Sequence, residues 1–137
     1  MRNRVLKVIV IFMFLFSNVV FADIQTVQPS VNTSVTTPQN ITYEHCTKMF
    51  AVNKEKLFYL TLGAITANKF TIEEIQTNNG YIIFKAANNK YLASISGIDN
   101  ANSILKITPS NNIYYFQPGI LLNMYKYIEL NLNTEIK

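Results

Sequence analysis

Three short β-rich segments joined by two Asn-rich turns lie between Phe70 and Ser96, and they constrain the fold more than any other part of the sequence. The sharpest signal is Asn79-Gly80. A type I′ hairpin turn needs positive φ at both central residues, which Asn tolerates and Gly adopts at no steric cost. The flanking residues are mainly Ile, Phe, Thr and Tyr, which favour strands. We therefore predict an antiparallel meander with a type I′ turn at Asn79-Gly80 and a second turn at Asn88-Asn89.

Alternation along these segments divides their side chains between the two faces of the sheet. In the middle segment Ile82, Phe84 and Ala86 alternate with Tyr81, Ile83 and Lys85, and in the last segment Tyr91, Ala93 and Ile95 oppose Leu92. The first segment, 70–76, loses its alternation at Glu73-Glu74. Either a β-bulge lies there or both faces of the strand are partly covered. A fourth strand is predicted over 103–108, ended by Pro109.

Two helices are predicted, one on each side of the meander. Asn53 is a good N-cap for a helix over 54–68, which has a wide apolar face. Pro118 is suited to the first position of a helix over 118–131, where its missing N–H costs nothing. Two short segments stay open: Ile41–Cys46 is either a strand or the start of a helix, and the aromatic run 113–116 is either a fifth strand or a buried loop.

The first 22 residues have the pattern of a secretory signal peptide. Arg2, Arg4 and Lys7 precede an unbroken apolar run, and small residues end the segment at Ala22. The alternative is an uncleaved membrane anchor through Val5–Ala22, for which residues 23–40, rich in Ser, Thr, Gln, Asn and Pro, would serve as a flexible tether. We predict a signal peptide over 1–22, a linker over 23–40, one domain over 41–132 and a frayed tail over 133–137, in an exported protein of the periplasm or the medium.

Composition excludes several classes of function. The 137 residues allow one domain, and the single cysteine excludes an intramolecular disulfide. Beyond Ala22 there are nine Lys, no Arg and eight acidic residues, a net charge of +1. A nucleic-acid partner would require clustered Lys and Arg, which are missing. The sequence also lacks metal-ligand spacings and a Gly-rich phosphate loop, so we predict no metal and no cofactor.

No residue pair has the arrangement that catalysis would need. His45-Cys46 combines imidazole and thiol, but adjacent side chains diverge on a strand and on a helix. Glu73-Glu74 would face opposite ways on a strand, whereas paired-carboxylate chemistry needs convergence. We therefore predict no catalytic residues. The one unusual cluster is aromatic, and we take Tyr114, Tyr115, Phe116 and Tyr125 as a possible ligand or partner surface, although they can equally be core and rim of the domain.

The predicted order of elements is a possible strand, a helix, three or four antiparallel strands and a last helix, which is typical of an α+β domain with both helices on one face of an antiparallel sheet of about four strands. Over roughly residues 41–131 this order resembles the helix-grip arrangement (β-α-β-β-β-β-α) of periplasmic domains such as those of the BamC lipoprotein. The chain has no lipid-bearing cysteine after its apolar run, so no site residues are carried over.

Three functions remain open from the sequence. The first is an exported, non-catalytic envelope or secreted module that binds a protein partner. The second is a carrier or sensor of a lipid or small apolar ligand in a cavity between helices and sheet. The third is a small enzyme of unknown class, which would need a convergent catalytic set.

Overall fold

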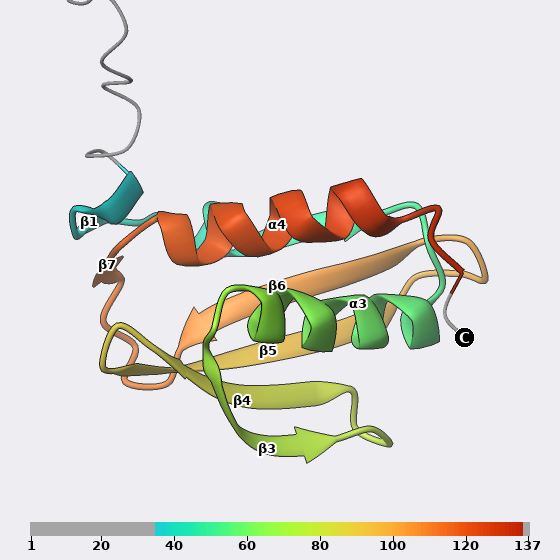
Figure 1. Cartoon of the computed structure of the whole chain (residues 1–137), viewed down its shortest axis with the longest axis horizontal. Helices are drawn as coiled ribbons and strands as arrows, with labels where there is room; N and C mark the ends of the chain where they lie inside the picture. Colours follow the sequence, from blue (N-terminus) through green and yellow to red (C-terminus); the bar gives the residue numbers. More distant parts are fainter. Residues whose placement is uncertain (1–34, 136–137) are drawn as a thin grey trace, which may run out of the picture. The chain divides into compact units, whose positions relative to one another are not determined.

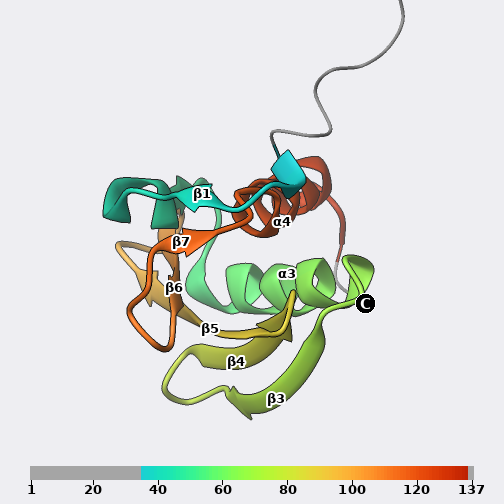
Figure 2. The same cartoon turned by 90° about the vertical axis from the view of Figure 1, so that its left-hand side faces the viewer.

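The computed structural model describes residues 35–135. The predicted signal peptide and most of the predicted linker lie outside this range. The described part is α+β, as predicted: helices α3 (Lys54–Ala67) and α4 (Gly119–Asn131) pack side by side on one face of an antiparallel sheet (Figures 1 and 2). The sheet has five strands in the order β2-β6-β5-β4-β3, one more than the predicted meander of about four.

The strands of this sheet have the bounds β2 (Thr47–Phe50), β3 (Thr71–Gln76), β4 (Tyr81–Ala86), β5 (Asn89–Gly97) and β6 (Ser103–Pro109). A second, two-stranded sheet pairs β1 (Gln39–Asn40) with β7 (Tyr115–Phe116). A short 3₁₀ helix, η1 (Tyr43–Cys46), connects β1 to β2. Within the described residues, strand pairing thus begins at Gln39, in the last part of the predicted linker.

Both helices form within one residue of the predicted bounds, but Pro118 is the N-cap of α4 and not its first residue, which is Gly119. The side chain of Asn53 accepts a hydrogen bond from the backbone N–H of Lys56 at 2.8 Å, which satisfies one of the free donors at the start of α3. Ile82, Phe84 and Ala86 of β4 and Tyr91, Ala93 and Ile95 of β5 are buried in the core, whereas the residues between them are not. Phe84, at the centre, stacks between Phe70 and Tyr91 with ring centroids 5.8 and 5.5 Å apart.

The type I′ turn is not at Asn79-Gly80, where we predicted it. Only Gly80 has positive φ there, +70°, and the loop from Thr77 to Gly80 lies between the paired residues Gln76 and Tyr81. Positive φ at two consecutive residues occurs in the next turn instead, at Ala87 and Asn88. Those two residues alone connect the paired Ala86 and Asn89, and a two-residue connection needs this conformation to follow the twist of the strands.

The structure also decides the segments that the sequence left open. The strand register shifts between Ile72 and Glu74, which confirms the bulge. The segment 41–46 contains the η1 helix, and the strand begins after it, at Thr47. The aromatic run ends in the short strand β7.

Candidate functional site

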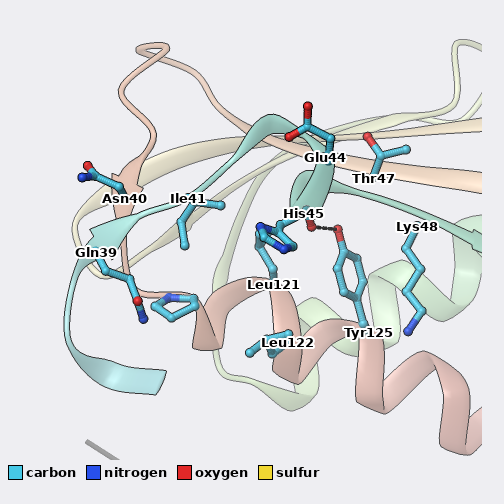
Figure 3. A pocket seen from close by; sticks show the side chains of 11 residues that line it. Gln39, Asn40, Ile41, Glu44, His45, Thr47, Lys48, Leu121, Leu122 and Tyr125 are labelled. Atoms are coloured by element: carbon cyan, nitrogen blue, oxygen red, sulfur yellow. Dashed lines mark hydrogen bonds between the residues drawn. The ribbon is translucent and has the colours of Figure 1, made fainter. Parts of the chain in front are cut away.

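A surface pocket of about 440 Å³ lies between the β1–η1–β2 segment and the first half of α4 (Figure 3). We call it the η1–α4 pocket. Its apolar lining consists of Ile41, Pro118, Leu121, Leu122 and Tyr125. Its polar lining consists of Gln39, Asn40, Glu44, His45, Thr47 and Lys48. One wall therefore comes from the N-terminal part of the described residues and the other from α4, about 80 positions later.

The helical repeat of α4 positions the apolar wall. Leu121 and Tyr125 are four residues apart, so they share a face of the helix, and both are buried. Leu122 is turned further out, and 53% of its surface is exposed. From the opposite wall, Ile41 is half-buried against the core. The pocket consequently has an apolar base that remains accessible to solvent.

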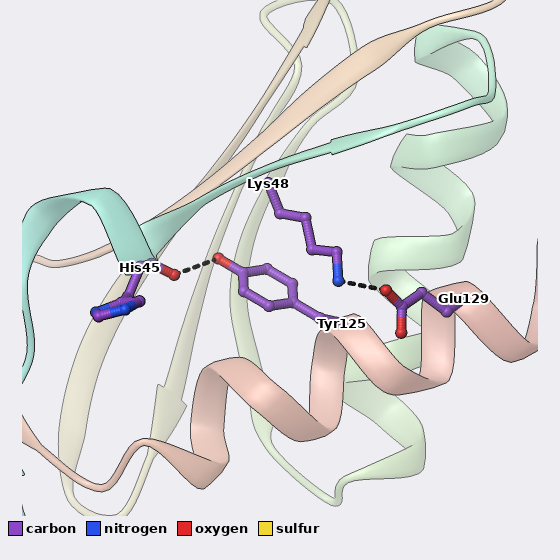
Figure 4. Close-up of polar contacts among 4 residues, drawn as sticks. All are labelled: His45, Lys48, Tyr125 and Glu129. Atoms are coloured by element: carbon purple, nitrogen blue, oxygen red, sulfur yellow. Dashed lines mark hydrogen bonds and ion pairs between the residues drawn. The ribbon is translucent and has the colours of Figure 1, made fainter.

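Tyr125 connects the two walls. Its hydroxyl donates a hydrogen bond to the backbone carbonyl of His45 at 3.1 Å, and its ring centroid lies 6.1 Å from that of Phe50 (Figure 4). Burial raises the pKa of Tyr125 far above its ordinary value, with a smaller electrostatic contribution from the nearby Cys46. The hydroxyl is therefore neutral at physiological pH and is a permanent donor to η1.

A second connection lies one helical turn further along α4. Lys48 of β2 forms an ion pair with Glu129, and Figure 4 shows Tyr125 between this pair and His45. The ammonium of Lys48 also lies 5.6 Å from the Tyr125 ring centroid. Both charged side chains are partly exposed, and pairs of this kind contribute roughly 0–1 kcal/mol to stability. The pair links the edge strand β2 to α4.

The charged groups of the polar rim differ in their partners. Thr42 Oγ1 and His45 Nδ1 share a hydrogen bond of 2.7 Å, and Lys48 is paired with Glu129. Glu44, in contrast, makes no ion pair with any residue between 35 and 135. Within that range the pocket rim consequently carries a carboxylate whose charge no cation balances.

Of the four aromatic residues predicted as a surface, only Tyr125 lines this pocket. Tyr114 is half-buried, with its ring centroid 6.2 Å from that of Tyr43. Tyr115 is exposed, whereas Phe116 is buried with its ring centroid 5.3 Å from that of Tyr91. The alternation of β7 sends these last two side chains to opposite sides, so the run does not form one surface. Sequence reasoning missed the Ile41 and Glu44 contributions, since nothing local in the sequence places them opposite α4.

Of the two pairs considered for catalysis, one contains a buried thiol, and the two carboxylates of the other are bonded to different side chains. Cys46 is fully buried, and burial, followed by the charge of Glu44, raises its pKa to about 11, so the thiol is protonated at neutral pH. Glu73 pairs with Lys90 at 2.8 Å and Lys85 at 3.2 Å, which lowers its pKa, while Glu74 accepts a hydrogen bond from the Tyr81 hydroxyl at 2.8 Å.

No group of three or more His, Cys, Asp or Glu side chains between residues 35 and 135 could hold a metal ion. None of the helices in the same range has the length and apolar character needed to cross a membrane.

No protein-family model matches the chain, and no curated protein has a significantly similar sequence.

Proposed function

We propose that the chain is an exported, non-catalytic module that binds a segment of a protein partner in the η1–α4 pocket. The observation that supports this proposal is the pocket itself, with its accessible apolar base and polar rim. Partner surfaces commonly combine an apolar centre, which a side chain of the partner fills, with a polar rim. The export part of the proposal depends on the signal-peptide pattern of residues 1–22.

The strand next to the pocket favours a protein segment as the ligand. β2 is an edge strand, and its residues Thr47 and Lys48 line the pocket. An extended segment can add to an open sheet edge through backbone hydrogen bonds while its side chains enter neighbouring pockets. The opposite edge strand, β3, is less suited to such pairing because it has a bulge and a Glu73 side chain that is bonded to two lysines.

A small apolar ligand is the second candidate. A volume of about 440 Å³ falls within the range of small-ligand sites, which are roughly 300–1,000 Å³. The pocket lies at the edge of the domain, however, while the space between helices and sheet is occupied by buried side chains of both. A carrier of this kind would hold its ligand beside Leu121 and Tyr125 rather than in a cavity under the helices.

Site-specific photocrosslinking in cells tests the proposal. A photoreactive residue is introduced at Leu122, which lines the pocket, or at Leu130, which is 73% exposed on the same helix but does not line it. We expect a protein adduct from position 122 and none from position 130, with mass spectrometry locating the crosslinked partner peptide. Equal adducts at both positions, or none at position 122, would contradict partner binding. A small-molecule adduct at position 122 alone would favour the second candidate.

A further inference from the structure

We propose that the partner segment is extended and combines an apolar anchor residue with an adjacent lysine or arginine. The anchor enters the η1–α4 pocket, and the cation pairs with Glu44. This inference depends on the proposed function and specifies the chemistry of the partner.

The requirement for a cation follows from the charges around the pocket. Lys48 is already paired with Glu129 and lies over the Tyr125 ring, and His45 shares its Nδ1 hydrogen bond with Thr42. The Glu44 carboxylate has no such partner in the described part of the chain. A neutral segment that covered Glu44 would remove water from a carboxylate without replacing its interactions, which is unfavourable. A basic residue supplies the missing charge.

The requirement for an apolar anchor follows from the base of the pocket. Leu121 and Tyr125 form its buried floor, and Leu122 leaves half of its surface in solvent. An aliphatic or aromatic side chain would cover these groups, as anchor residues of partners do in other interfaces. A polar side chain would find few hydrogen-bonding partners on this wall.

The relative position of the two features favours an extended segment. Glu44 belongs to η1, which leads directly into the edge strand β2, and the apolar wall lies across the pocket on α4. A segment that follows the β2 edge therefore passes both. In an extended chain successive side chains point to opposite sides, so an anchor directed at the α4 wall and a cation directed at Glu44 on η1 are adjacent in the partner sequence.

Binding of defined peptides tests this specificity. The protein is expressed from the full sequence, residues 1–137, and then purified. Fluorescent nonapeptides with a Ser/Thr background carry Leu-Lys, Leu-Gln, Leu-Glu or Ser-Lys at their centre, and binding is measured by fluorescence polarisation. We expect Leu-Lys to bind about tenfold more tightly than Leu-Glu, and Ser-Lys to bind weakly. Glu44→Gln should reduce the Lys-over-Glu preference to less than about twofold, while Glu135→Gln, an exposed carboxylate outside the pocket, should leave it unchanged.

The outcomes separate this inference from the proposed function. If Leu-containing peptides bind with equal affinity whatever their charge, and Leu122→Ser weakens the binding of all of them, the required cation is refuted and the proposed binding in the pocket stands. If no peptide binds and position 122 gives no crosslink, both fail. A dimer that Leu122→Ser dissociates would identify a second copy as the occupant. Binding that appears only after deletion of residues 23–34 would identify that segment of the chain itself. Either of these two results overturns the inference.

Discussion

Replacement of Gly80, in the loop between β3 and β4, should destabilise the protein, and Gly80→Ala tests the size of this effect. A non-Gly residue at the observed φ of +70° costs about 1–2 kcal/mol. An added Cβ would lie 2.7 Å from the backbone oxygen of Ile95, so that strand must shift. The shift would weaken the 2.7 Å hydrogen bond from the Ile95 N–H to the Gly80 carbonyl, worth about 0.5–1.5 kcal/mol. The smaller entropy of the unfolded alanine chain offsets about 0.4–1 kcal/mol. We expect Gly80→Ala to lower the free energy of unfolding by about 2 kcal/mol.

Urea denaturation followed by circular dichroism measures this difference, and Asn79→Ala is the matched control. Asn79 is exposed and has no positive φ, so its replacement should change stability by less than about 0.5 kcal/mol. The reasoning would be refuted if Gly80→Ala were as stable as the natural chain. Equal destabilisation by both substitutions would refute it too, because a type I′ turn centred on Asn79-Gly80 would need positive φ at both residues.

Three further substitutions test other parts of the structure. Ala87→Gly should stabilise the protein by about 0.5–1 kcal/mol in urea denaturation. Glycine removes the conformational cost of a φ of +49°, and the larger entropy of the unfolded glycine chain offsets part of this gain. A loss of stability would contradict the turn. Gly63→Ala should be about 1 kcal/mol more favourable in a Tyr127→Leu background than in the natural chain, because its Cβ would lie 2.9 Å from the Tyr127 hydroxyl; equal effects in both backgrounds would contradict this packing. Burial raises the pKa of the Cys46 thiol from 9.0 to about 11, so between these pH values the native state keeps a proton that the unfolded state loses. The free energy of unfolding should therefore fall by about 2–3 kcal/mol between pH 9 and 11, and it should fall less steeply in Cys46→Ala. An equally steep fall in the variant would contradict the burial of the thiol.

The fold could be predicted where local chemistry and tertiary structure agree. Asn53 caps α3 through its own side chain, and the alternation of β4 is a property of its own residues. The type I′ turn was misplaced because Ala87 gives no local signal for positive φ. Its conformation is imposed by the pairing of Ala86 with Asn89, which depends on the neighbouring strands. The strands β1 and β7 likewise have only two residues each, which is too few to show an alternation of apolar and polar residues.

The pocket was harder to predict than the fold. The sequence indicated Tyr125 as part of a possible surface, but it grouped that residue with Tyr115 and Phe116, which alternation separates. Glu44 and Ile41 reach the site only because η1 and β2 return along α4. No periodicity relates residues about 80 positions apart, and a site built from both ends of a domain is therefore visible only in three dimensions.

The same junction of the two ends determines when the domain can finish folding. Gln39 pairs with Phe116, Tyr125 bonds to His45, and Lys48 bonds to Glu129, 81 positions away. Such contacts close long loops, whose entropic cost is met only once the last helix is present. A chain emerging from the ribosome can form its central hairpins early, but it cannot close the η1–α4 pocket before its C-terminal helix has been synthesised. The η1–α4 pocket therefore forms only once α4 is present, and truncation within α4 would remove the pocket while leaving the hairpins β3–β4 and β4–β5 intact in sequence.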